Sequence, residues 1–251
     1  MRYDPGRDLG WLLLRPWVAI PRLVHVLWSL AGLVLVLLLR GGSSDPAVQQ
    51  GLARRILNTL TGLGPCFIKL GQALSTRPDL VRRDWLEELT RLQDDLPAFP
   101  HATALACIRD ELGAPAEELF EEFPDTPVAA ASLGQVYKAR LQGQHWVAVK
   151  VQRPNLTFIL RRDLVLIRAL GVLTAPLLPL NLGFGLGGII DEFGRSLFEE
   201  IDYGLEAANA ERFATLFADN DAVYIPKVER MLSSPRVLTT SWIDGAKMRD
   251  S

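Results

Sequence analysis

A chain of 251 residues can hold one large domain or two small ones, and a hydrophobic fraction of 49% excludes wholesale disorder. A formal net charge of -2 gives no indication of nucleic-acid binding. The two cysteines are too few for a disulfide scaffold, which suits a reducing compartment, and the three isolated histidines predict no metal site.

An apolar segment lies near the N-terminus. The residues between Arg22 and Arg40 are mostly apolar, and their number is close to the lower limit of about 17 for a helix that spans a bilayer. Arginines precede the segment and would keep its N-terminus cytoplasmic, but further arginines follow closely and weaken that orientation. The alternatives are a helix buried against the protein and one in the membrane interface. We expect residues 1–42 to be membrane-associated on the cytoplasmic side, either peripheral or single-pass through residues 23–39.

Residues 46–115 have the pattern of a helical segment, which follows a flexible break at residues 41–46. In its first helix four apolar residues recur at intervals of four and so share one face: Val48, Leu52, Ile56 and Leu60. Further amphipathic helices follow, and the last of them ends at a glycine and a proline.

After Phe123 the pattern changes to strands. Residues 128–141 and 146–153 are rich in strand-forming residues and are separated by a short turn, which predicts a small sheet that ends at Pro154. A helix with Asn155 as its N-cap is predicted next.

A long amphipathic helix is predicted from about Ile189 to about Asp219, and two short strands around the turn at residues 233–235 close the chain. The glycine-rich stretch at residues 183–188 matches G-x-G-x-x-G, but no strand precedes it, so we interpret it as a connector. The order of helices, strands, helices and strands predicts an α+β fold rather than a doubly wound sheet.

The hairpin at residues 128–154 is the main candidate for chemistry. On the glycine loop of protein kinases, G-x-G-x-x-G-x-V, Gly134 and Val136 take the last two places, while Ala129 and Ala131 replace the first two glycines. The next strand ends in V-A-V-K, which places Lys150 where a kinase lysine reaches the α- and β-phosphates. Because alanine restricts the backbone, we expect a stiffer cradle over a nucleotide. The alternative is an ordinary hairpin with an exposed lysine.

Four motifs occur in order along the chain. They are K-x-G-Q at Lys69, Gly71 and Gln72, the alanine-rich loop at residues 129–136, the strand lysine in residues 147–154, and E-x-D at Glu200 and Asp202, followed by Glu206 and Asn209. With these motifs the chain resembles the UbiB-like atypical kinases, the aarF-domain family, over roughly residues 46–250.

The resemblance implies a protein-kinase-like N-lobe, a small antiparallel sheet with helix C, behind a helical extension at residues 46–115. The N-lobe would occupy residues 116–251, with a helical insert, and end near the hinge. ATP and Mg²⁺ are the implied cofactors, and a small-molecule or lipid-like substrate in isoprenoid quinone or lipid metabolism is the implied partner. A membrane surface is a further expected partner.

The resemblance also implies roles for individual residues. Lys150 would hold the phosphates, and Glu206 would orient Lys150. The residues implied to cover the nucleotide are Ala129, Ala130, Ala131, Ser132, Gly134 and Val136, and those implied near adenine are Ser241 and Ile243. Lys69, Gln72 and Glu200 would gate the site, with Glu200 holding Lys69 over the nucleotide, and Asp202 is a further implied catalytic residue.

Two alternatives stay open. The acidic stretch at residues 199–209 could be a solvated helix face, although Glu199, Asp202, Glu206 and Asn209 have the spacing of one helical stripe. No D-F-G triplet and no H-x-D loop occurs in the 251 residues, so the metal-binding half of a kinase site is not in this sequence. We therefore expect a truncated or partial kinase chain without its C-lobe, or else a non-catalytic, membrane-bound interaction module.

Overall fold

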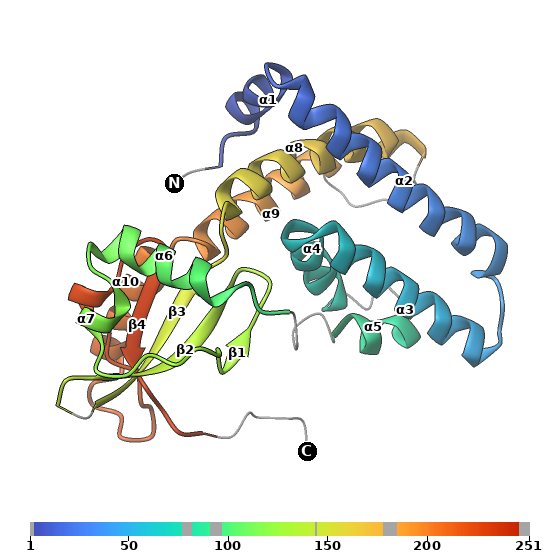
Figure 1. The fold of residues 1–251 in the computed structure, drawn as a ribbon. Helices are drawn as coiled ribbons and strands as arrows, with labels where there is room; N and C mark the ends of the chain where they lie inside the picture. Colours follow the sequence, from blue (N-terminus) through green and yellow to red (C-terminus); the bar gives the residue numbers. More distant parts are fainter. Residues whose placement is uncertain (1–2, 77–81, 91–96, 144, 178–184, 246–251) are drawn as a thin grey trace. The chain divides into compact units, whose positions relative to one another are not determined.

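The computed structural model describes residues 3–76, 82–90, 97–143, 145–177 and 185–245 (Figure 1). It consists of two compact units, and each is built from two stretches of the chain. The helical unit contains Met1–Leu96 and Asn155–Glu199, and the sheet unit contains Pro97–Pro154 and Glu200–Ser251. These boundaries differ from the predicted segments 1–42, 46–115 and 116–251. The reason is that the helix at residues 101–112 packs on the sheet, whereas the helix that follows Pro154 joins the helical unit.

The helical unit is formed by α1 Pro5–Leu13, α2 Pro16–Arg40, α3 Pro46–Leu63, α4 Pro65–Ser75, α5 Arg83–Thr90, α8 Leu156–Thr174 and α9 Leu186–Glu200. The first four helices begin at a proline, whose fixed φ and missing N–H suit the first helical position. Asp4 and Asp45 cap α1 and α3, because their carboxylates accept hydrogen bonds from the backbone amides of Arg7 and Ala47 at 3.0 and 2.9 Å.

The predicted apolar face of α3 is confirmed. Leu52 and Leu60 are buried, and Val48 and Ile56 are half-buried. Next to them the first turns of α4 bury Cys66, and this burial raises the pKa of its thiol well above the ordinary value. Cys66 is therefore a small core residue and not a reactive thiolate.

A buried ion pair joins α2 to α8. The guanidinium of Arg22 donates two hydrogen bonds, of 2.9 and 2.7 Å, to the carboxylate of Asp163, whose side chain is 0% exposed. Arg162 contacts the same carboxylate at 2.8 Å. The charge of Asp163 is thus neutralised from two sides, and α2 is held to the helical unit along one of its faces.

Asn155 precedes α8, as predicted, but its side chain makes no capping hydrogen bond. Its backbone has φ 55° and ψ 20°, the left-handed conformation that asparagine tolerates better than most residues. Asn155 therefore turns the chain out of the sheet unit through its backbone.

The sheet unit contains one antiparallel sheet in the order β1-β2-β3-β4, which confirms the predicted small sheet and α+β class. Its strands are β1 Ala129–Ala130, β2 Gly134–Leu141, β3 His145–Gln152 and β4 Val237–Ser241. Of the two strands predicted around the turn at residues 233–235, the one after the turn is confirmed as β4, and the one before the turn is wrong. Residues Arg230–Leu232 form a 3-10 turn, and Val228 makes only an isolated bridge to Thr240.

The two faces of the sheet differ. One face buries Tyr137, Val149 and Val151 against α6 His101–Leu112 and α7 Ala116–Leu119. The other face packs Leu238 of β4 against α10 Tyr203–Leu216. Figure 1 shows α6 and α10 on opposite sides of β4. Side chains alternate along a strand, so the residues next to Val149 and Val151 must point to the face shared with α10.

The predicted single helix from Ile189 to Asp219 is wrong, because the chain breaks between α9 and α10. Asp202 occupies the break as the N-cap of α10, and its carboxylate accepts a hydrogen bond of 3.1 Å from the amide of Gly204. The amide side chain of Gln152 donates a hydrogen bond of 2.7 Å to the carbonyl of Ile201 in the same break. The predicted stripe from Glu199 to Asn209 therefore does not exist as one helical face.

Replacing Asp202 with alanine is expected to lower the free energy of unfolding by about 1 kcal/mol, since the amide of Gly204 loses its side-chain acceptor. Urea unfolding followed by circular dichroism measures this change. Asp202→Asn is the matched control, because asparagine caps helices as well as aspartate does. A loss as large in the asparagine variant as in the alanine variant would mean that the carboxylate acts by its charge and not as a cap.

Candidate functional site

Four side chains form a row across the sheet. The register pairs Ala129 with Val136, Val136 with Lys150, and Lys150 with Leu238. Residues directly opposite each other in an antiparallel sheet point to the same face. The ammonium of Lys150 therefore stands in an otherwise apolar row, and two members of the predicted loop, Ala129 and Val136, lie in that row.

Lys150 forms an ion pair with Glu206. Its Nζ lies 2.9 and 2.7 Å from the two carboxylate oxygens of Glu206, which comes from the first turn of α10. The side chains are 33% and 43% exposed, so solvent or a ligand can reach the pair. The structure thus brings together the lysine and the glutamate that the resemblance paired.

Tyr203 lies under this pair. Its ring centroid is 4.5 Å from the Nζ of Lys150, within the range of a cation–π contact. The ring is buried, and its hydroxyl has no hydrogen-bond partner among the described residues. Burial raises the pKa of this hydroxyl, and the carboxylates of Glu206 and Glu200 raise it further. Tyr203 therefore stays a neutral phenol and holds Lys150 through its ring.

The sequence analysis did not identify Tyr203 as a site residue. The signal that could have found it is its spacing, because Tyr203 stands three residues before Glu206 and so shares its face of α10. A side chain on that face must lie near the lysine with which Glu206 pairs.

The loop between β1 and β2 is a closed turn. The amide of Ala131 donates to the carbonyl of Gly134 at 2.8 Å, and the guanidinium of Arg153 donates to the carbonyl of Ala131 at 2.9 Å. The amide of Arg153 also donates to the carbonyl of Leu133 at 2.9 Å. These hydrogen bonds use the N–H and the carbonyl of Ala131 and tie the turn to the residue after β3.

None of the residues 128–136 has a positive φ. Glycine is required where the backbone is left-handed, and alanine fits wherever φ is negative. Ala129, Ala130 and Ala131 are therefore compatible with this turn, which is a stiffer structure than a glycine-rich cradle.

Gly134 is the one glycine of the loop, and close packing requires it. A Cβ at this position would lie 2.5 Å from the hydroxyl oxygen of Tyr203 and 2.6 Å from the carbonyl oxygen of Val151. Neither distance leaves room for a carbon atom. The glycine thus lets the start of β2 approach both Tyr203 and β3.

The residues predicted near adenine lie at the end of β4. Ser241 is the register partner of Val147, so its side chain is on the face away from Lys150. Its hydroxyl accepts a hydrogen bond of 2.9 Å from the amide of Lys227. Ile243 follows and is exposed, whereas Ser132 of the loop is buried. A contact from Ser241 to a ligand on the Lys150 face would therefore come from its backbone.

The predicted gating residues and Asp202 are distributed over both units. Lys69 and Gln72 lie on α4 of the helical unit, while Glu200 ends α9 and Asp202 caps α10. Their roles over a nucleotide stay predictions.

The described residues fit a nucleotide phosphate better than a metal ion. The half-exposed ammonium of Lys150, in a row of apolar side chains, presents a positive charge beside surface that a nucleotide could cover. No group of three or more His, Cys, Asp and Glu is placed to hold a metal ion in the part of the chain that the structure describes. We therefore assign no magnesium ligand to these residues.

A small antiparallel sheet whose third strand presents a lysine to a glutamate of a following helix has the architecture of a protein-kinase-like N-lobe. The sequence model of a protein family, the ABC1 atypical kinase-like domain, matches residues 91–251 of this chain. The chain therefore belongs to the ABC1 atypical kinase-like family, as its motifs predicted.

Individual relatives agree with this assignment. An uncharacterized protein of Synechocystis sp. is 45% identical over 100% of this chain and 44% of its own length. The Arabidopsis thaliana protein ACTIVITY OF BC1 COMPLEX KINASE 1, chloroplastic, is 46% identical over 82% of this chain and 30% of its own length. Among solved structures, the Mycobacterium tuberculosis protein Rv3197 in complex with erythromycin has a TM-score of 0.51 and 35% identity, covering 71% of this chain and 44% of that one. The chain thus spans less than half the length of these relatives.

Proposed function

We propose that this chain supplies the ATP-covering half of an atypical kinase or ATPase. The observation that carries the proposal is the ion pair between Lys150 and Glu206, 2.7 Å long and open to solvent, on the sheet face next to the alanine loop. A kinase-like fold needs this pair in place before a nucleotide can be held correctly. ATP, with Mg²⁺ bound elsewhere, would supply the phosphoryl group.

Each residue of the site would have one task. Lys150 would donate from its ammonium to the phosphates, and Glu206 and the ring of Tyr203 would keep that ammonium in place. The closed turn at residues 131–134 would cover the nucleotide and exclude water. Because the backbone of Ala131 is already hydrogen-bonded, the turn would bind phosphate less through its amides than a glycine loop does.

We propose further that the substrate is a small or lipid-like molecule in isoprenoid quinone or lipid metabolism, handled at a membrane. Two findings support this proposal. Among the described residues, α2 is the helix that is long and apolar enough to cross a bilayer. In addition, the related Mycobacterium tuberculosis protein was solved with a small organic molecule, erythromycin.

A second candidate is a non-catalytic module that binds ATP or a partner without turnover. These 251 residues contain neither D-F-G nor H-x-D, so binding of ATP and its turnover by this chain are separate questions. Release of phosphate from ATP by the purified chain, above a Lys150→Ala control, would exclude the module. Saturable ATP binding without phosphate release would favour it.

The proposal is tested first by binding alone. Isothermal titration of the 251-residue chain with ATP is expected to give saturable binding. The affinity for AMP should be weaker, because AMP lacks the β-phosphate, one of the two phosphates that Lys150 would contact. Equal affinities for ATP and AMP would contradict the role of Lys150, and absence of saturable ATP binding would contradict the nucleotide site itself.

A further inference from the structure

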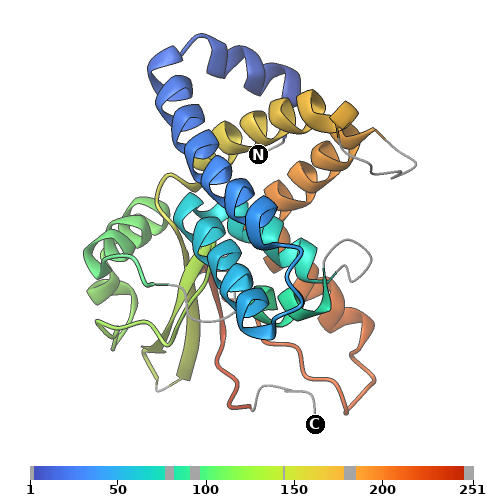
Figure 2. The same cartoon turned by 90° about the vertical axis from the view of Figure 1, so that its right-hand side faces the viewer.

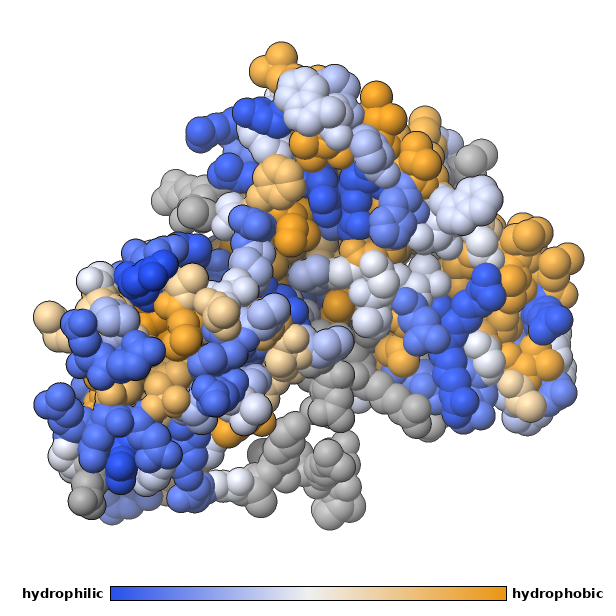
Figure 3. All heavy atoms as spheres, viewed as in Figure 1, coloured by the Kyte–Doolittle hydropathy of each residue, from blue (hydrophilic) through white to orange (hydrophobic). Residues whose placement is uncertain are grey.

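One face of α2 exposes large hydrophobic side chains along its whole length. Trp17, Ile20, Val24, Trp28, Leu35 and Leu38 are between 58% and 82% exposed and recur at helical spacing. Figure 3 shows hydrophobic side chains gathered over α2. A contiguous apolar surface of this kind marks an interaction site on a soluble protein.

The opposite face of α2 packs inside the helical unit. Val26 and Leu33 are buried there, Arg22 pairs with the buried Asp163, and α3 lies beside α2 (Figures 1 and 2). If α2 crossed a bilayer, it would carry the arginines of α3 into the hydrocarbon, where charged side chains are strongly disfavoured. A helix that is packed on one side and apolar on the other fits the plane of a bilayer surface.

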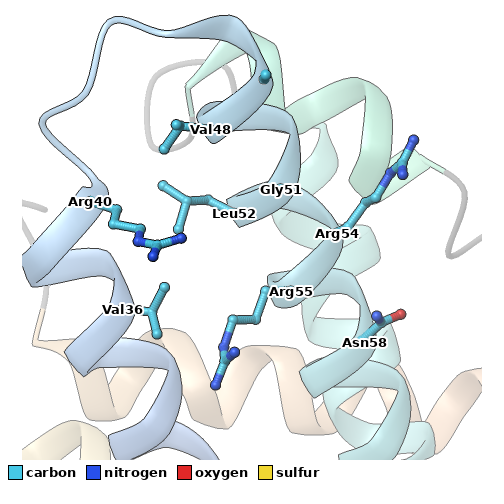
Figure 4. A pocket seen from close by; sticks show the side chains of 9 residues that line it. Val36, Arg40, Val48, Gly51, Leu52, Arg54, Arg55 and Asn58 are labelled. Carbon is cyan, nitrogen blue, oxygen red and sulfur yellow. The ribbon is translucent and has the colours of Figure 1, made fainter.

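A pocket of about 520 Å³ lies between the end of α2 and α3 (Figure 4). Arg40 of α2 and Arg55 of α3 extend into the space between the two helices, whereas Arg54 extends on the other side of α3. Val36, Val48 and Leu52 contribute apolar side chains to the lining of the pocket. The pocket thus combines cationic groups with an apolar wall.

The guanidinium groups of Arg40 and Arg55 make no ion pair or hydrogen bond with any residue that the structure describes. Both side chains are exposed, and no carboxylate lines the pocket. Two unneutralised guanidinium groups at one opening repel each other, and an anion between them would relieve that repulsion. Guanidinium matches phosphate geometrically through paired hydrogen bonds.

We propose that this pocket binds the phosphate of an anionic phospholipid, whose acyl chains lie along the exposed face of α2. The proposal deepens the proposed membrane association and rests on it, but it is independent of the nucleotide site. The charge of Arg40 and Arg55 complements the phosphate, and Val36, Val48 and Leu52 suit the apolar neck of the lipid. The bilayer would then cover α2, and the arginine pocket would select anionic membranes.

The test uses the 251-residue chain and co-sedimentation with vesicles. One set is pure phosphatidylcholine, and the other contains equal parts of phosphatidylcholine and phosphatidylglycerol. The chain is expected to bind the anionic vesicles more tightly than the phosphatidylcholine vesicles. The double variant Arg40→Gln with Arg55→Gln is expected to bind the anionic vesicles about 25-fold more weakly, because each arginine near an anionic surface raises the affinity by roughly fivefold. The matched control is Arg109→Gln with Arg212→Gln, which removes the same charge from exposed positions of the sheet unit.

Each outcome has one meaning. An equal loss in the two double variants would overturn the pocket and leave only diffuse attraction. Equal binding of the unmodified chain to both vesicle sets would overturn the anionic lipid but keep membrane association. Binding to neither set would overturn both, while ATP titration of the same preparation would still report on the nucleotide site.

Discussion

Replacing Lys150 with alanine is expected to weaken ATP binding by about 10- to 100-fold. This is the change in affinity expected when one hydrogen bond between charged groups is lost. The variant should still fold, because Glu206 is 43% exposed and remains hydrated without its partner. Isothermal titration with ATP measures the change, and thermal unfolding verifies that the variant is folded.

Lys138→Ala provides the matched control for this prediction. Lys138 lies on the neighbouring strand β2, and its ammonium lies 5.0 and 4.7 Å from the ring centroids of Trp146 and Trp242. Its removal lowers the charge of the sheet by the same amount but leaves the ion pair of Lys150 intact. If both variants lost the same affinity, Lys150 would have no specific contact with the nucleotide.

Replacing Gly134 with alanine is expected to lower the free energy of unfolding by about 1–3 kcal/mol. The added methyl group would meet the hydroxyl of Tyr203 at 2.5 Å and the carbonyl of Val151 at 2.6 Å. The tyrosine is buried, and the carbonyl belongs to a central strand, so neither can move without disturbing the sheet. Chemical denaturation measures the loss.

Two further variants separate the causes. Gly62→Ala, on α3, has nothing within 4 Å of the new Cβ and is expected to stabilise the protein by about 0.5–1 kcal/mol. Combining Gly134→Ala with Tyr203→Phe should recover part of the loss but not all of it, because the carbonyl of Val151 remains. A Gly134→Ala variant as stable as the unmodified chain would show that the turn rearranges freely.

The centre of the site could be predicted from the sequence because it depends on local pattern. The strand-forming residues at 146–152, preceded by a turn, predicted a strand, and the V-A-V-K sequence places Lys150 on it. Glu206 was assigned by resemblance, and the ion pair is present in the structure.

The remaining features depend on contacts between residues that are distant in sequence. Tyr203 and Gly134 belong together only because α10 packs against the start of β2. The break at Ile201 and Asp202 was not predicted, because the pattern of residues 189–219 is compatible with one helix and an aspartate occurs both within helices and as an N-cap. Likewise, the unpaired state of Arg40 and Arg55 is visible only once α2 and α3 lie side by side.

The left-handed turn at Asn155 has a consequence for synthesis. The chain then forms α8 and α9 before it returns to the sheet unit at Glu200, so the sheet unit is interrupted in the order of translation. Lys150 leaves the ribosome 56 residues ahead of Glu206, a delay of roughly 3–11 s at typical elongation rates. During this interval the nascent hairpin holds its ammonium without a carboxylate, and the sheet itself is complete only when β4 has followed Glu206.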